Sequence, residues 1–204
     1  MVLTPLRSVA AAIVVLAIGP LAVCSGNGCE PPAWELQILH WLAEQRNPAL
    51  DVLFVTVTWV GSLWLLLPLA IALVAAQVAG GHNGRALFFA AAFGGAVALA
   101  YFAKIMVARA RPSALEPLVT MPGDLSFPSG HAMQITAFAL AAVMALVPPK
   151  QRGRWFALAW IAIVLVGTSR LYLQVHFPSD VLAGTAAAAL WVFGFVAVNK
   201  ERHA

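Results

Sequence analysis

Long apolar runs follow one another along most of this chain, and their apolar and polar positions do not alternate as in strands. A helix crossing a hydrocarbon core of about 30 Å needs about 20 apolar residues, and a backbone in lipid has to satisfy its hydrogen bonds internally. The runs therefore predict six membrane-spanning helices, at residues 9–23, 60–79, 86–107, 132–147, 155–171 and 181–198. Apolar residues already begin near Asp51, and Gly61 and Ser62 interrupt them, so the first turns are expected in the interface or the protein core.

A segment between the first two spans has an amphipathic pattern. It follows Pro31 and Pro32, and at helical spacing one side carries Trp34, Ile38, Trp41 and Leu42. The other side carries Glu35, Gln37, Glu44 and Gln45. This pattern predicts a short interfacial helix on the membrane surface, and the alternative is a capped loop that packs against the bundle.

The composition supports an integral membrane protein. Of the 204 residues, 62% are hydrophobic and 10% are charged, which is more apolar than an ordinary soluble domain. We expect one all-α domain, a polytopic helical bundle over residues 1–204, with the motif-bearing core at about 51–198. The formal charge of +4 is small and scattered, so nucleic acid is not an expected partner, while the oligomeric state stays open.

The amino terminus allows two interpretations. Arg7, an apolar run and Cys24 resemble a secretory or lipoprotein signal, but Val23 is larger than the small residue such a cleavage site usually requires. We therefore expect the first helix to be retained. Cys24 and Cys29 form either a short-loop disulfide or two unpaired thiols, and the sequence leaves both open.

The charged residues are concentrated in three short motifs. The first, K-x6-R-P, runs from Lys104 to Pro112 at the end of the third span. Seven residues are almost two helical turns, so we expect Lys104 and Arg111 on one helix face, with Pro112 stopping the helix. Arg109 is interpreted as an anchor that reaches toward the interface, which is also the simplest interpretation of Lys104 taken alone.

The second motif, P-S-G-H, covers Pro128 to His131 and precedes a long apolar run. This is the pattern of a helix start. Ser129 is expected as the N-cap, and Gly130 lets backbone N–H groups approach an anion at the positive end of the helix. Taken alone, the motif also fits an ordinary capped helix with an incidental His131.

The third motif, S-R-x5-H-x3-D, covers Ser169 to Asp180. Arg170 ends the fifth span, and His176 lies in the next loop. Asp180 follows four residues later, close enough to accept a bond from Nδ1–H and to leave Nε2 free to attack. An interfacial histidine beside a helix-capping aspartate is the alternative for this motif taken alone. However, all three motifs fall on the same side of the membrane, and together they supply the cations and histidines of a phosphoryl-transfer centre.

The ordered set of motifs resembles the type 2 phosphatidic acid phosphatase (PAP2) family, which shares its site with vanadium haloperoxidases. The resemblance covers about residues 51–198 and implies a six-helix membrane core. It implies five phosphate-binding residues, Lys104, Arg111, Ser129, Gly130 and Arg170, with a supporting contact from Ser169. It also implies three catalytic residues, with His176 as the nucleophile, Asp180 as its orienting partner and His131 as the acid that protonates the leaving group.

We therefore expect a metal-independent lipid phosphatase that works without a cofactor through a phosphohistidine. Only one of the eight acidic residues belongs to the motifs, whereas a two-metal site usually needs several. The favoured substrates are undecaprenyl pyrophosphate and phosphatidylglycerophosphate, ahead of phosphatidic acid and the 1-phosphate of lipid A. The alternatives are a phosphotransferase with a hydroxyl acceptor, a vanadate-dependent haloperoxidase and a non-catalytic lipid-binding or transport protein.

The distribution of cations predicts the orientation. With six spans, one side carries Arg7, Arg85, Lys150, Arg152, Arg154, Lys200 and Arg202. The other side carries Arg46, Lys104, Arg109, Arg111 and Arg170, and three of these belong to the expected phosphate site. Because cytoplasmic loops are enriched in Lys and Arg, both termini are expected inside. The active site is then expected on the periplasmic or extracellular face of the plasma membrane.

Overall fold

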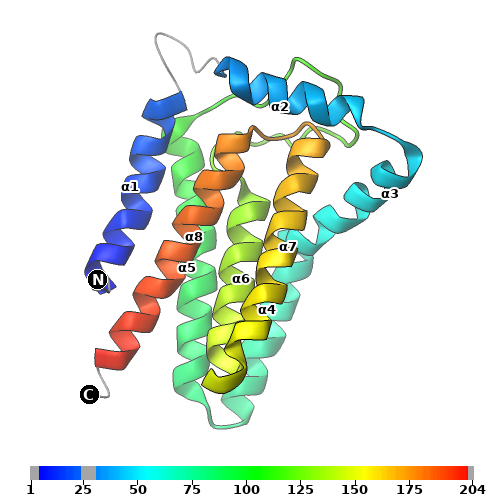
Figure 1. The fold of residues 1–204 in the computed structure, drawn as a ribbon. Coiled ribbons are helices and arrows are strands. Elements are labelled where there is room, and N and C mark those ends of the chain that lie inside the picture. Colours follow the sequence, from blue (N-terminus) through cyan, green and yellow to red (C-terminus); the bar gives the residue numbers. More distant parts are fainter. Residues whose placement is uncertain (1–4, 24–30, 202–204) are drawn as a thin grey trace.

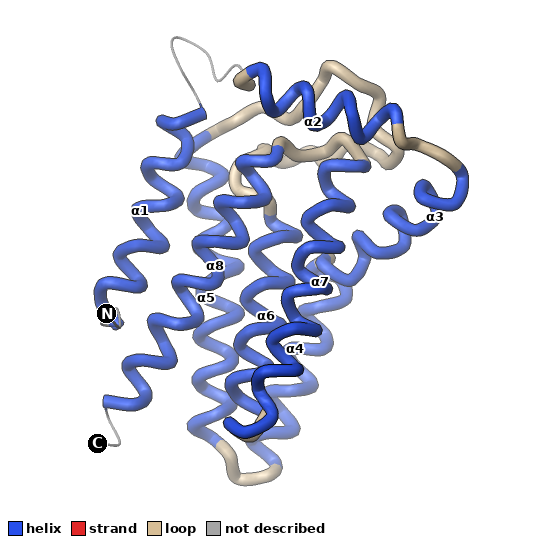
Figure 2. Tube along the Cα trace, in the orientation of Figure 1, coloured by secondary structure: helices blue, strands red, loops and turns tan. Residues whose placement is uncertain are grey.

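The computed structural model describes residues 5–23 and 31–201, and every regular element in these ranges is helical (Figures 1 and 2). The α-helices are α1 (Pro5–Val23), α2 (Ala33–Glu44), α3 (Pro48–Val57), α4 (Leu63–Ala79), α5 (Asn83–Val107), α6 (Gly130–Leu146), α7 (Arg152–Tyr172) and α8 (Pro178–Glu201). Two short 3₁₀ helices, η1 (Thr58–Gly61) and η2 (Pro149–Gln151), lie between them. Cys24 and Cys29, and with them the question of a disulfide, lie outside the described residues.

Three helices among the described residues are long and apolar enough to cross a membrane, namely Asn83–Val107, Pro149–Tyr172 and Pro178–Phe195. The pair Pro48–Gly61 and Leu63–Ala79 counts as a fourth if it is one span bent by 40°. The apolar segments Ser8–Pro20 and Gly130–Leu146 are shorter. The all-α bundle is therefore confirmed, whereas six spans remain a prediction.

The central helix of the bundle is α6, which packs against α5, α7 and α8 and also touches α4. Most of its residues are buried, and Phe138 meets Phe89 and Phe93 of α5 edge to face, with ring centroids 5.4 and 5.6 Å apart. On the outside, α1 packs along α8 (Figure 1). The first residue of α6 is Gly130, so the best-packed helix of the fold presents its amino terminus at one end of the bundle.

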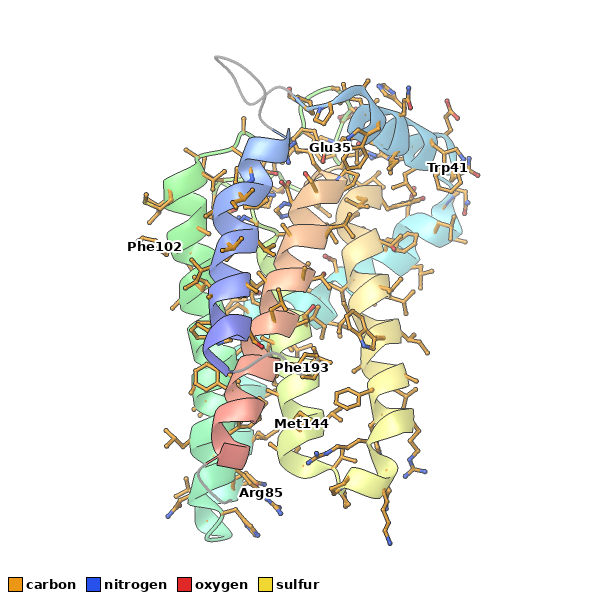
Figure 3. All side chains as sticks on the ribbon, turned by 60° about the vertical axis from the view of Figure 1, so that its left-hand side comes forward. Glu35, Trp41, Arg85, Phe102, Met144 and Phe193 are labelled. Carbon is orange, nitrogen blue, oxygen red and sulfur yellow. The ribbon has the colours of Figure 1, made fainter. Side chains whose placement is uncertain are left out.

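The two ends of the bundle differ in structure. One end carries α2 and the long loop between α5 and α6, and α2 crosses it at a steep angle to the bundle helices (Figure 1). The other end carries the short α4–α5 and α6–α7 connections, and Arg85 lies there, far from Glu35 (Figure 3). The three motifs all lie at the end that α2 covers, because they occupy the end of α5, the start of α6 and the α7–α8 connection.

The amphipathic segment does form a helix, but its faces differ from the prediction. Glu35, placed on the polar side by the sequence pattern, is fully buried, together with Leu39 and Leu42. Trp34 and Trp41, on the predicted apolar side, are 43% and 59% exposed, as expected for side chains that face the membrane surface. The prediction of two simple faces was wrong because the end of the bundle presents polar partners to Glu35, and the helix turns its carboxylate toward them.

The interruption at Gly61 and Ser62 is confirmed as a bend. The 3₁₀ helix η1 ends at Gly61, and Ser62 caps α4 by accepting a hydrogen bond from the N–H of Trp64. A Cβ at position 61 would lie 2.4 Å from Val166 of α7 and 3.3 Å from the Cβ of His131, so only glycine lets η1 approach this closely. The bend thereby brings η1 against two of the motif-bearing helices.

Candidate active site

A cavity of about 160 Å³ opens at the end of the bundle that α2 covers. It is lined by six of the residues predicted from the motifs, Lys104, Arg111, Gly130, His131, Arg170 and His176. On this measure of volume about 10–15 Å³ already holds one water molecule, so the cavity has room for several heavy atoms, as a phosphoryl group requires. Ser129 and Asp180 are fully buried behind this lining.

Lys104 and Arg111 meet in the cavity, but they do not share a helix face. The helix α5 ends at Val107, and Ala108 leaves it in the left-handed conformation at a φ of 52°. Arg111 therefore lies on the loop, and the prediction that Pro112 stops the helix was wrong. The two cations are brought together by the carboxylate of Asp124, which lies 3.1 Å from Lys104 Nζ and 2.5 Å from Arg111 Nη2.

Asp124 is a residue that the sequence analysis missed. Its side chain is 48% exposed and lies at the rim of the cavity, between two of the expected phosphate-binding cations. Partial burial opposes its ionisation, but the charges of Lys104 and Arg111 outweigh that effect and lower the pKa of Asp124. The carboxylate is therefore ionised near neutral pH and competes with any other anion for the same two cations.

Arg170 lies in the last turn of α7 and is held by η1. Its Nη1 donates a 2.5 Å hydrogen bond to Thr58 Oγ1, so the bend before α4 orients this guanidinium. The neighbouring Ser169 does not face the cavity. Its hydroxyl is fully buried and donates to the carbonyl of Val166 in the same helix, which makes the predicted phosphate contact wrong.

The P-S-G-H motif starts a helix, as predicted. Ser129 is the N-cap residue of α6, but its buried Oγ has no hydrogen-bond partner among the described residues. Its backbone N–H donates to the carbonyl of Asp180 at 3.0 Å, which ties the second motif to the third. Gly130 and His131 line the cavity, so the first turn of α6 presents its free N–H groups to an anion there.

The contacts of His176 define its tautomer. Its Nε2 lies 3.1 Å from Arg111 Nη1, and a guanidinium can only donate, so Nε2 carries the lone pair. The proton is then on Nδ1, which faces Ser126 Oγ at 3.4 Å and Asp180 Oδ2 at 3.5 Å. The geometry therefore presents an unprotonated Nε2 at the cavity, as a nucleophile requires.

Ser126 is a second residue that the sequence analysis missed. Its hydroxyl donates a 2.5 Å hydrogen bond to Asp180 Oδ2 while facing His176 Nδ1, so it lies between the histidine and the carboxylate. Asp180 Oδ2 also accepts from the N–H of Phe177 at 2.9 Å. The only available signal was a hydroxyl residue two positions before Pro128, and that is too common to identify a site.

Charge and burial keep His176 neutral. Its side chain is 1% exposed, and burial, followed by the positive charges of Arg111 and Arg170, lowers the pKa of His176 well below its ordinary value. The nearby Asp124 acts in the opposite direction but does not outweigh these effects. A neutral imidazole is the form that attacks phosphorus.

Arg109, predicted to be an exposed anchor, is fully buried. It pairs with Glu35 and Asp180, and its guanidinium carbon lies 4.2 Å above the ring of Phe177.

Gln134 is another polar residue that the sequence did not indicate. It lines the cavity one turn below Gly130, and its buried Oε1 lacks a hydrogen-bond partner among the described residues.

The arrangement is suited to the transfer of a phosphoryl group. Three cations and the start of a helix surround a cavity in which one histidine presents a lone pair and another histidine lies in the lining. Such fixed donors stabilise the charge that spreads over the equatorial oxygens in the transition state. Within the described ranges, no three His, Cys, Asp or Glu side chains are grouped so as to hold a metal ion.

Comparison with known proteins agrees with this geometry. A phosphatidylglycerophosphatase B from Bacillus subtilis is 32% identical over 72% of this chain and 74% of its own length. An undecaprenyl-diphosphatase from Sulfolobus acidocaldarius is 36% identical over about half of each chain, 52% and 50%.

The fold is also shared with a solved structure. The crystal structure of a transmembrane PAP2-type phosphatidylglycerolphosphate phosphatase from Bacillus subtilis superposes with a TM-score of 0.81 at 27% identity, over 95% of this chain and 96% of that one. The family model of the PAP2 superfamily matches residues 85–204, which contain all three motifs. Because this match spans more than half of the sequence, the chain belongs to the PAP2 superfamily.

Proposed function

We propose that this protein is a membrane lipid phosphatase that hydrolyses a lipid phosphate through a phosphohistidine. The observation that carries the proposal is the lone pair of His176 Nε2, which is presented to a cavity lined by Lys104, Arg111 and Arg170. The enzymes named among the relatives, a phosphatidylglycerophosphatase and an undecaprenyl-diphosphatase, act on lipid phosphates or diphosphates. A non-catalytic transporter would not need an activated histidine at this point.

In the first step, Nε2 of His176 attacks phosphorus and the bond from phosphorus to the leaving oxygen breaks. His131 gives its proton to that oxygen, which leaves as the alcohol or lipid monophosphate. Asp180 and Ser126 hold the Nδ1 side of the nucleophile as positive charge develops on the imidazole. The three cations, Ser129 and Gly130 stabilise the transferred phosphoryl group.

In the second step, His131 takes a proton from water, and the oxygen of that water attacks phosphorus. The bond from phosphorus to Nε2 then breaks, inorganic phosphate leaves, and both histidines return to their starting states. The charge on the transferred phosphoryl group, which a metal ion would stabilise in other phosphatases, is here met by Lys104, Arg111, Arg170 and the N–H groups at the start of α6. We therefore propose that the reaction is independent of a metal ion.

The outer wall of the cavity suits a substrate whose tail stays in the bilayer. Trp64 at the start of α4 and Tyr101 on α5 line the cavity and are 86% and 54% exposed. Phe102, next on α5, is 63% exposed and points away from the bundle (Figure 3). A lipid phosphate can therefore enter between the ends of α4 and α5 while its chains remain against these apolar side chains.

The substrate proposal is tested with a panel of lipids. Purified protein in detergent is given phosphatidylglycerophosphate, undecaprenyl pyrophosphate, phosphatidic acid and lipid A, and released phosphate is measured. We expect one of the first two to have the highest kcat/KM. His176→Ala should abolish turnover, while His40→Ala, an exposed histidine on α2, serves as the matched control. Turnover by a folded His176→Ala variant near the wild-type rate would refute the covalent mechanism.

We further propose six spans, with α1, the bent α3–α4 segment, α5, α6, α7 and α8 crossing the membrane and α2 lying in the interface. The exposed Trp34, Ile38 and Trp41 of α2 support an interfacial position. Among the five cations at the α2 end, three line the cavity and Arg109 is buried in ion pairs, so only Arg46 remains to weigh against the seven that the sequence predicts for the opposite side of the membrane. This asymmetry supports cytoplasmic termini and an active site on the outer face of the plasma membrane.

The orientation is tested with reporter fusions. A reporter that is active only after export should be active when inserted within residues 113–121 and silent when fused after Lys150. The matched control is the same pair of fusions with a reporter that is active only in the cytoplasm, which should give the reverse pattern. Export of the reporter at Lys150 would place the site inside and refute the proposed orientation.

A further inference from the structure

The helix α2 is docked onto the catalytic end of the bundle by polar contacts. Gln174, in the loop before His176, donates from Nε2 to the carbonyl of Leu39 at 2.8 Å. Glu35, one turn earlier, is fully buried, and its Oε1 accepts from the backbone N–H of Ser179 at 2.9 Å and from its hydroxyl at 2.5 Å. A buried carboxylate is costly unless it is paired, so these contacts call for a functional or structural reason.

Arg109 is the charged partner of that carboxylate. Its Nη2 lies 2.5 Å from Glu35 Oε2, and its Nη1 lies 2.7 Å from Asp180 Oδ1 and 2.7 Å from Ser179 Oγ. All three charged side chains are fully buried. A single guanidinium therefore joins α2, the loop after α5 and the first turn of α8.

The two oxygens of Asp180 have separate partners. Oδ1 is paired with Arg109, while Oδ2 accepts from Ser126 and Phe177 and faces His176. Because Arg109 fixes the far oxygen, the carboxylate cannot rotate away from the imidazole without breaking a buried ion pair. The orientation of Asp180 is thus set from the side opposite the substrate cavity.

Arg109 also balances charge. It lies between the buried carboxylates of Glu35 and Asp180 and pairs with both. Without it, the site would hold two negative charges that no cation neutralises together. A desolvated pair of this kind is costly, because the two like charges repel each other and burial removes the water that would screen them. This repulsion would displace Asp180 from its contact with the imidazole of His176.

We propose that Arg109 and Glu35 are positioning residues of the phosphatase, through which the interfacial helix α2 holds the catalytic carboxylate correctly turned toward His176. This inference rests on the proposed roles of His176 and Asp180. Neither Arg109 nor Glu35 lines the cavity, so both act through Asp180 and not on the substrate. The inference makes α2 a part of the catalytic apparatus and not only a membrane contact.

The test compares Arg109→Met, Glu35→Gln and the double variant as full-length protein in detergent. We measure kcat on phosphatidylglycerophosphate and undecaprenyl pyrophosphate, the competitive inhibition constant of inorganic phosphate, and the thermal midpoint. We expect kcat to fall about 100-fold in Arg109→Met, by analogy with the 10–100-fold losses on removing residues that orient metal ligands, and about 5-fold in Glu35→Gln. The inhibition constant should stay within about 2-fold, because the cations of the cavity are untouched. Arg154→Met and Glu44→Gln, both exposed, are the matched controls.

The double variant separates charge balance from packing. Removing Glu35 together with Arg109 leaves Asp180 as the only buried carboxylate of the group, so kcat should recover about 5-fold relative to Arg109→Met. If the pair only filled space, the two losses would add or the double variant would be slower still. Equal or lower activity of the double variant would therefore overturn the proposal.

Three further variants, Arg109→Lys, His176→Ala and Asp180→Asn, keep the outcome decisive. If Arg109→Met does not fold, Arg109→Lys retains the charge but not the forked geometry, and it should lower kcat about 10-fold with an unchanged inhibition constant for phosphate. Full activity of Arg109→Lys and Glu35→Gln would overturn the inference. His176→Ala and Asp180→Asn are measured in parallel. Activity in His176→Ala would refute the proposed mechanism itself, whereas an inactive His176→Ala beside a fully active Arg109→Met would refute only the positioning role.

Discussion

Replacing Asp124 with asparagine is expected to tighten the binding of phosphate. In the structure this carboxylate lies within ion-pair distance of Lys104 and Arg111, the same cations proposed to hold the substrate. A phosphate entering the cavity has to take over these contacts. Asparagine keeps the size of the side chain but removes the competing charge.

The magnitude follows from the exposure of the pair. The Asp124 side chain is 48% exposed, so solvent screens both interactions and each contributes about 0.5–1 kcal/mol, within the range for exposed pairs. Together they amount to about 1–2 kcal/mol, which corresponds to roughly a 5- to 30-fold change in a binding constant. Phosphate displaces the Asp124 carboxylate in both the bound ground state and the transition state. Removing this charge should therefore change kcat little, by less than about 3-fold.

The assay is competitive inhibition by inorganic phosphate, measured on the best lipid substrate at neutral pH. The inhibition constant should fall 5- to 30-fold in Asp124→Asn. The difference between the wild-type and variant constants should become smaller at high ionic strength, because salt screens the carboxylate. Glu116→Gln removes an exposed charge from the same loop and is the matched control. A higher inhibition constant for phosphate together with a lower kcat would refute competition between Asp124 and phosphate. It would show instead that Asp124 holds the two cations in place for catalysis.

Three other outcomes are expected. His131→Ala should lower kcat less for an activated aryl phosphate than for a lipid alcohol, because a good leaving group needs less protonation; equal losses for both would refute the acid role. His176→Gln should make the loss of stability in acid less steep. The fold lowers the pKa of His176, so the unfolded chain binds the proton first, and the contribution of this one histidine to stability falls by about 1.4 kcal/mol per pH unit below about pH 6.5. Thermal unfolding of both proteins between pH 7 and 5 measures this, and parallel curves would contradict it. Activity should persist in excess EDTA, and vanadate should inhibit; loss on chelation that magnesium restores would show that a metal takes part.

The sequence predicted the parts of the protein that depend on local pattern. Hydropathy indicated a helical membrane protein, the glycine and serine at positions 61 and 62 marked the bend, and P-S-G-H marked the start of α6. The predicted span 86–107 ends where α5 ends, but the expectation that the helix continues as far as Pro112 was wrong, because Ala108 adopts a left-handed conformation that no propensity indicates. Arg109 was misread for the same reason, since a helix continuing to Pro112 would have turned it outward.

The residues that the sequence could not identify are those whose partners are distant in the chain. Ser126 lies 54 positions from Asp180, and Arg109 lies 74 positions from Glu35. Neither the loop after α5 nor the connection after α7 has a periodicity that fixes where its side chains point.

What the sequence by itself determined was the set of reactive side chains, because the proposed phosphate binding and histidine attack require particular residue types at short spacings that can be read directly. Only the tertiary structure decided which carboxylate neutralises which cation and which hydroxyl faces His176. These choices depend on how α2 and the long loop close over the end of the bundle. Burial then makes each unpaired charge costly, so the packing of distant segments selects the partners that hold His176 and Asp180 in place.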